Sequence, residues 1–155
     1  MKRILIVMML LFGVLLHADE PTKGLDTLSS EVRGKFVHEM QYIEKEVQKL
    51  FSNMVKGNYE VISKTAMDIQ SSYIIKRKLT EEQRVELKEK MSKEFIQLDK
   101  HFYESAGKLA VAAKFQDVYN MQNAFFDMTK TCLKCHSTYV TSRFPKLAEE
   151  VGVGD

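Results

Sequence analysis

Two cysteines and a histidine near the C-terminus are the residues of this chain best suited to chemistry. They stand as Cys132-Leu-Lys-Cys135-His136 and use both cysteines of the 155-residue chain. On an α-helix, residues three and four positions apart share one face, so all three side chains would project together. Two thiols can add to the vinyl groups of one porphyrin while the adjacent imidazole binds its iron, and Cys-x-x-Cys-His is the motif for this attachment. The spacing therefore predicts one covalent haem c on Cys132 and Cys135, with His136 as an axial iron ligand.

Other uses of paired cysteines fit the sequence less well. A structural zinc site needs four ligands, and only His38 and His101, on two different predicted helices, could complete the pair. A thioredoxin-like couple needs a strand before the cysteines, whereas the pattern there is helical. A disulfide between residues three apart on one helix closes too short a loop to stabilise the fold.

The N-terminal segment predicts export. Lys2 and Arg3 precede an apolar run over residues 4–16, which is too short for a comfortable membrane span. Such a segment is typical of a secretory signal peptide, here residues 1–18 with cleavage after Ala18; an uncleaved anchor is the alternative. The interpretation places the chain in the bacterial periplasm, where haem c is attached, and disfavours a cytosolic reducing couple.

The remaining residues, 19–155, number about 137, enough for one compact domain and too few for two. Without Lys2 and Arg3 the chain has 21 basic and 21 acidic residues, so it is close to neutral. No basic block of the kind that binds nucleic acid is present. We therefore expect a single domain without a nucleic-acid partner.

The apolar spacing after residue 29 is helical throughout. Four helices are predicted, of which the first spans residues 30–56 and the second carries the apolar residues Ile62, Ala66, Ile69 and Tyr73. The third begins at the capping box Thr80–Gln83, and its apolar residues are Leu87, Met91, Phe95, Leu98, Phe102, Ala106 and Leu109. The fourth is capped by Asp117, and its inward-facing residues are Val118, Met121, Phe125, Met128, Cys132, Cys135 and Tyr139. Short connections favour an all-α, antiparallel up-down-up-down four-helix bundle. The tail after Pro145 is predicted to fray.

Together these features resemble the cytochrome c′ family and its low-spin, six-coordinate bundle relatives. Residues 109–117, followed after a fixed gap by the haem motif, are similar to the segment joining the third and fourth helices of that group, and residues 54–57 to the end of its first helix. One departure is that Arg33 is followed one turn later by Val37, so the resemblance assigns no distal residue. It implies a second function, binding of nitric oxide or carbon monoxide at a five-coordinate haem, and leaves open a homodimer through the first two helices.

The second axial ligand is predicted from the first helix. A distal ligand must point into the core and carry a sulfur or nitrogen lone pair. Met40 fits, because it stands on the apolar stripe Val32, Phe36, Met40, Ile43, Val47, Leu50 and Met54, whereas His38 is expected to face water. Buried methionines often only fill gaps, so a vacant or sterically blocked distal side is the main alternative, and ligation by His38 or another residue is a third. With Met40 bound, the predicted function is one-electron transfer with redox partner proteins; an enzyme is disfavoured because this stripe offers no acid–base group.

Five further residues have weaker assignments. His101 is expected to be a solvated surface histidine. Lys130 and Lys134 could steer an acidic redox partner or simply form a solvated helix face. Arg143 is placed two helical turns past His136, where it could pair with a haem propionate, and Tyr139 is expected to pack in the core against the porphyrin.

Overall fold

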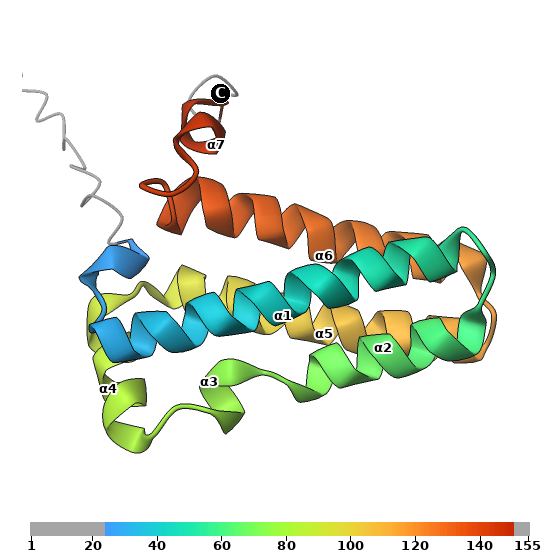
Figure 1. Cartoon of the computed structure of the whole chain (residues 1–155), viewed down its shortest axis with the longest axis horizontal. Helices are drawn as coiled ribbons and strands as arrows, with labels where there is room; N and C mark the ends of the chain where they lie inside the picture. The colour runs from blue at the N-terminus through green and yellow to red at the C-terminus, as the bar shows by residue number, and fades with distance from the viewer. Residues whose placement is uncertain (1–23, 151–155) are drawn as a thin grey trace, which may run out of the picture.

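The computed structural model describes residues 24–150, and this part of the chain is helical, with no strand (Figure 1). The all-helical prediction is therefore confirmed for these residues. The elements are a 3-10 turn, η1, at Leu25–Thr27, and the helices α1 (Ser30–Met54), α2 (Tyr59–Ser71), α3 (Ile74–Arg77), α4 (Glu81–Lys90), α5 (Lys93–Lys114), α6 (Val118–Tyr139) and α7 (Pro145–Glu150).

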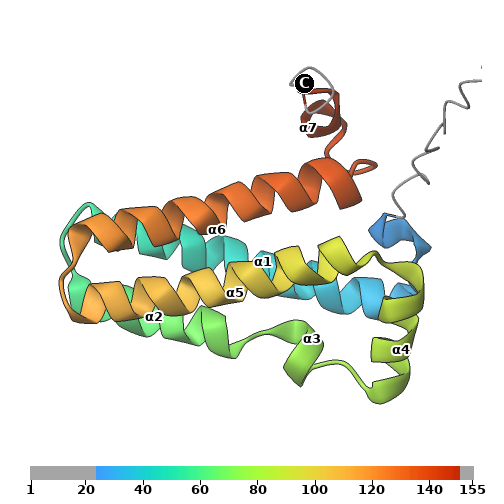
Figure 2. The same cartoon turned by 180° about the vertical axis from the view of Figure 1, so that it is seen from behind.

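The four longest helices, α1, α2, α5 and α6, lie side by side, and each runs opposite to the one before it (Figures 1 and 2). The backbone of α5 packs closely against α2 and α6, and α1 packs against α2. The backbones of α1 and α6 approach each other less closely than these pairs. The short helices α3 and α4 form the connection from α2 to α5 at one end of the molecule (Figure 2).

Local side chains set the ends of α1 and the start of α6. Ser29 caps α1 by accepting a hydrogen bond from the Val32 N–H at 3.3 Å. The helix ends two residues earlier than predicted, and Gly57 then adopts a left-handed φ of 70°. The break between α5 and α6 falls where it was predicted: Gln116 has a φ of 55°, and Asp117 accepts a hydrogen bond from the Asn120 N–H at 3.0 Å.

The predicted third helix is wrong in one respect, because it is interrupted. The capping box at Thr80 is present and opens α4, but Met91 is extended, with φ −110° and ψ 148°. Ser92 then caps a new helix by accepting a hydrogen bond from the Phe95 N–H at 3.2 Å. A serine competes with the helical backbone for hydrogen bonds, and here it starts α5. The second helix also ends early, so Tyr73 lies in the link to α3.

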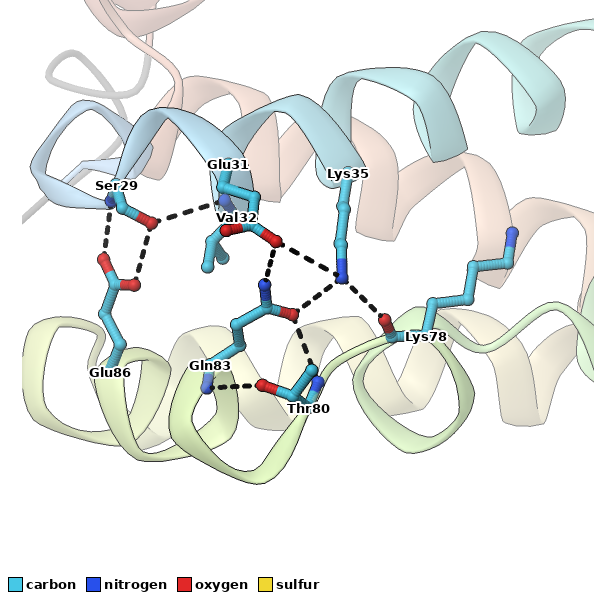
Figure 3. A network of polar contacts seen from close by, with 8 residues as sticks. All are labelled: Ser29, Glu31, Val32, Lys35, Lys78, Thr80, Gln83 and Glu86. Atoms are coloured by element: carbon cyan, nitrogen blue, oxygen red, sulfur yellow. Dashed lines mark hydrogen bonds and ion pairs between the residues drawn. The ribbon is translucent and has the colours of Figure 1, made fainter.

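A polar network holds α4 against the start of α1 (Figure 3). Ser29 donates through its backbone N–H and its hydroxyl to the Glu86 carboxylate, at 2.5 and 2.8 Å. The Gln83 amide donates to Glu31 at 2.6 Å and accepts from Lys35 at 2.8 Å. Because Gln83 also belongs to the capping box, the residue that starts α4 is the residue that docks it.

The apolar interior consists of two clusters. The larger cluster joins α1, α2, α5 and α6, and the smaller cluster joins the start of α1 to α3, α4, the start of α5 and the end of α6. The fully buried members of the larger cluster include Leu50, Ile62, Ile69, Leu109 and Met128, and those of the smaller cluster include Val32, Ile74, Leu87 and Phe95.

Several predictions concern residues outside the described part of the chain. The predicted signal peptide, residues 1–18, and the cleavage after Ala18 lie there, as does the end of the tail, residues 151–155. Residues 145–150 form α7, so this part of the predicted frayed tail is helical. Of the helices in residues 24–150, none is both long and apolar enough to cross a membrane.

Candidate functional site

The motif lies in the last two turns of α6, whose register starts at the Asp117 cap. Cys132 and Cys135 are half-buried and are free thiols. Cys132 packs against the larger apolar cluster and Cys135 against the smaller one. The two thiols therefore face the interior at the seam between the clusters, although neither is fully buried as the predicted stripe implied.

Burial keeps both thiols protonated. It raises the pKa of Cys132 to about 11. Burial also raises the pKa of Cys135 to about 12, with smaller contributions from the negative charge of Asp99 and from Cys132. A redox-active Cys-x-x-Cys pair needs a thiolate with a lowered pKa. The surroundings of these cysteines therefore do not favour a dithiol–disulfide couple.

His136 is half-buried beside the cysteines, and its imidazole ring stacks on the Phe144 ring with 4.6 Å between centroids and an angle of 17° between planes. Burial lowers the pKa of His136, and the nearby positive charge of Arg143 lowers it further. A neutral imidazole keeps the nitrogen lone pair that a metal needs. Arg143 itself is exposed in the turn after α6, so its predicted place two helical turns past His136 is wrong: the helix ends at Tyr139.

The predicted face of α1 is displaced by one residue near Met40. Glu39 is fully buried, at 0% exposed, while Met40 is half-buried against the larger apolar cluster. The buried positions of α1 are Val32, Phe36, Glu39, Ile43 and Leu50. The expectation that this helix offers no interior acid–base group is therefore wrong. His38 is exposed, as predicted.

Glu39 belongs to a buried acidic group that the sequence did not indicate. Its carboxylate pairs with the Lys78 ammonium and accepts a hydrogen bond from the Tyr103 hydroxyl at 3.4 Å. The Tyr73 and Tyr103 rings pack with 4.7 Å between centroids. Burial, more than the neighbouring carboxylates, raises the pKa of Tyr73 to about 12 and that of Tyr103 still further.

Asp99 on α5 is the second carboxyl of this group. Its Oδ2 atom is buried and has no hydrogen-bond partner among the described residues. Burial raises the pKa of Asp99 to about 7, with a further contribution from the charge of Glu39. The Asp99 charge also raises the pKa of Cys135, so Asp99 lies near the Cys132–His136 motif. Helical spacing could have indicated both carboxyls, although the predicted stripes left them out. Glu39 follows Phe36 by three residues and Asp99 follows Phe95 by four, so each shares a helix face with a buried phenylalanine.

The other predicted residues take simpler places. Tyr139 is buried, packs edge-to-face on Phe95 at 5.2 Å and shares a hydrogen bond of 3.0 Å with Ser92, as a core residue. His101 is partly exposed in a shallow depression on α5. Lys130 and Lys134 are exposed on α6, which fits both of their predicted roles.

Two further findings complete the description of the site. Among the described residues, no group of three or more His, Cys, Asp and Glu side chains is placed to hold a metal ion, so His38 and His101 do not complete a zinc site with the cysteines. Comparison with known proteins finds no matching family model, curated protein or solved structure.

Proposed function

We propose that this protein is a periplasmic monohaem c-type cytochrome, built as an antiparallel four-helix bundle, that carries single electrons between partner proteins. Haem c supplies an iron that changes between the ferric and ferrous states, a one-electron change. The observation that carries the proposal is the protonation state and placement of three side chains of the motif. Cys132 and Cys135 are protonated thiols turned inward on one face of α6, and His136 beside them is a neutral imidazole held by a stacked ring.

This donor set fits a covalently held porphyrin. Cys132 and Cys135 would hold it by thioether bonds, each formed by adding S–H across one vinyl group, which needs no oxidant. The two apolar clusters that contact the cysteines would exclude water from the ring. The alternating directions of the four longest helices support the bundle (Figure 1). The helices α1 and α6, which carry the proposed ligands, approach each other less closely than the other packed pairs, as a porphyrin held between them would require.

Met40 remains the proposed sulfur ligand. It borders the same apolar cluster as Cys132, and a neutral thioether would keep the iron low-spin and raise the reduction potential. A second candidate function, gas binding at a five-coordinate haem, is favoured by one specific observation. The fully buried position on this part of α1 belongs to Glu39, and Met40 is only half-buried.

The attachment is tested by producing the full chain with haem-maturation machinery and extracting it with acidified organic solvent. Wild-type protein should retain one haem, and Cys132→Ser with Cys135→Ser should lose it. Leu133→Ala is the matched control, because Leu133 lies within the motif but is 57% exposed. Retention of haem by the double variant after extraction contradicts attachment at this motif.

Absorption spectra of the ferric and ferrous protein separate the two functions. Electron transfer through a six-coordinate iron predicts a low-spin spectrum in both states and slow uptake of carbon monoxide. A high-spin spectrum with immediate carbon monoxide binding would support the gas-binding function in its place.

A further inference from the structure

Directly after α6 the chain turns sharply into α7 (Figure 1). The helix ends at Tyr139, and the Val140 carbonyl accepts hydrogen bonds from the N–H groups of Arg143 and Phe144, both at 3.1 Å. Pro145 then starts α7. This tight turn brings Phe144, eight residues after His136, onto the imidazole ring.

The stack between Phe144 and His136 has the geometry of a specific contact. The separation of 4.6 Å lies at the short end of the range for aromatic pairs, and the angle of 17° makes the rings nearly parallel. The Arg143 guanidinium carbon lies 5.9 Å from the centre of the Phe144 ring, within the range of a cation–π contact. The Phe144 ring therefore contacts the Arg143 guanidinium as well as the His136 imidazole.

The turn that carries Phe144 is tied to the rest of the fold. The Ser142 hydroxyl donates to the Asp26 carboxylate at 2.5 Å, which joins the turn to η1. Gly24 lies so close to the end of α6 that a Cβ atom there would come within 3.1 Å of the Tyr139 carbonyl oxygen. Pro145 restricts the backbone of Phe144 to extended conformations. The ring thus has little freedom to leave the imidazole.

We propose that Phe144 is a positioning residue for His136, and that its ring sets the plane of the axial imidazole; this inference rests on the proposed function. A ligand bound through one nitrogen can still rotate about its bond to the metal. In most metal sites a hydrogen bond to the other ring nitrogen stops this rotation. The polar contacts within residues 24–148 include none to the His136 ring, whereas the parallel stack permits only a narrow range of ring orientations.

The test uses the full haem-loaded chain and spectroscopic measurements that report the iron–histidine bond. Phe144→Ala should broaden and shift the ferric electron paramagnetic resonance signal and shift the haem methyl resonances in proton nuclear magnetic resonance spectra of the ferric protein. Phe144→Tyr, which keeps the flat ring, should restore both signals. Phe126→Ala is the control, because it removes an aromatic ring from the surface of α6, where Phe126 is 64% exposed and ten residues before His136.

Phe144→Leu separates stacking from simple filling of space and remains informative if Phe144→Ala does not fold. Leu keeps apolar volume without a flat ring, so its signals should shift as those of the Ala variant do. Wild-type signals in haem-loaded Phe144→Leu would overturn this inference and leave the proposed function intact. A wild-type protein that carries no covalent haem would overturn the proposed function, and the inference with it.

Discussion

Replacing Asp99 with asparagine should stabilise the protein at mildly alkaline pH and remove part of its pH dependence. Within residues 24–148, the buried Oδ2 atom of Asp99 has no hydrogen-bond partner. Burial, assisted by Glu39, raises the pKa of Asp99 from 3.8 to about 7. Asparagine has a similar shape and cannot ionise. The variant therefore avoids the cost of a buried, unpaired negative charge.

The sign and size of the effect follow from linkage. Between about pH 4 and pH 7 the folded protein keeps a proton on Asp99 that the unfolded chain has released, so the free energy of unfolding falls as pH rises through this window. A pKa difference of roughly 3 units at 1.36 kcal/mol each sets an upper limit of about 4 kcal/mol. Below about pH 4 the carboxyl is protonated in both states and contributes no such dependence.

The measurement is the free energy of unfolding in urea, followed by circular dichroism, at about pH 4, 6 and 8. Asp99→Asn should become more stable relative to wild type as pH rises. The stability difference at the lowest pH, where ionisation of Asp99 contributes least, measures the effect of replacing a carboxyl with an amide and is subtracted from the differences at higher pH. Glu39→Gln should lower the pH at which the fall in the free energy of unfolding ends, because it removes a charge that raises the pKa of Asp99. An equal stability difference at all three pH values would refute the reasoning.

Four other predictions concern the two proposed ligands and two glycines, one inside α1 and one after it. His136→Gly should keep the haem attached but open a coordination position that added imidazole fills, and an unchanged spectrum would exclude His136 as the ligand. Met40→Ala should turn a low-spin iron high-spin, lower its reduction potential and speed carbon monoxide binding to the ferrous protein; identical spectra with and without Met40 would contradict its assignment. Gly34→Ala should raise the free energy of unfolding by about 0.5–1 kcal/mol, because a Cβ there meets nothing within 4 Å in an exposed part of α1. Gly57→Ala should lower it by about 1 kcal/mol, because Gly57 has a φ of 70°; thermal unfolding of the pair checks both signs.

Features that depend only on residues close together in the chain follow from the sequence. Ser29, Thr80 and Asp117 cap helices in the structure because a short polar side chain binds the backbone N–H groups two or three residues ahead, whatever surrounds it. Gly57 ends the first helical segment because only glycine adopts its backbone conformation at no cost. The common face of Cys132, Cys135 and His136 likewise follows from helical spacing alone.

Packing between distant segments selects one of several arrangements that are acceptable locally. Glu39 is buried in place of Met40, although Phe36 and Ile43 on either side of them are buried as predicted. Packing against other helices decides between these two adjacent positions, and the spacing along α1 does not. The break at Ser92 accompanies the docking of α4 against α1, a contact that a continuous apolar stripe does not reveal. The contact of Phe144 with His136 requires a turn held by distant partners, including η1. Such contacts join residues that no helical period relates, so only the folded chain brings them together.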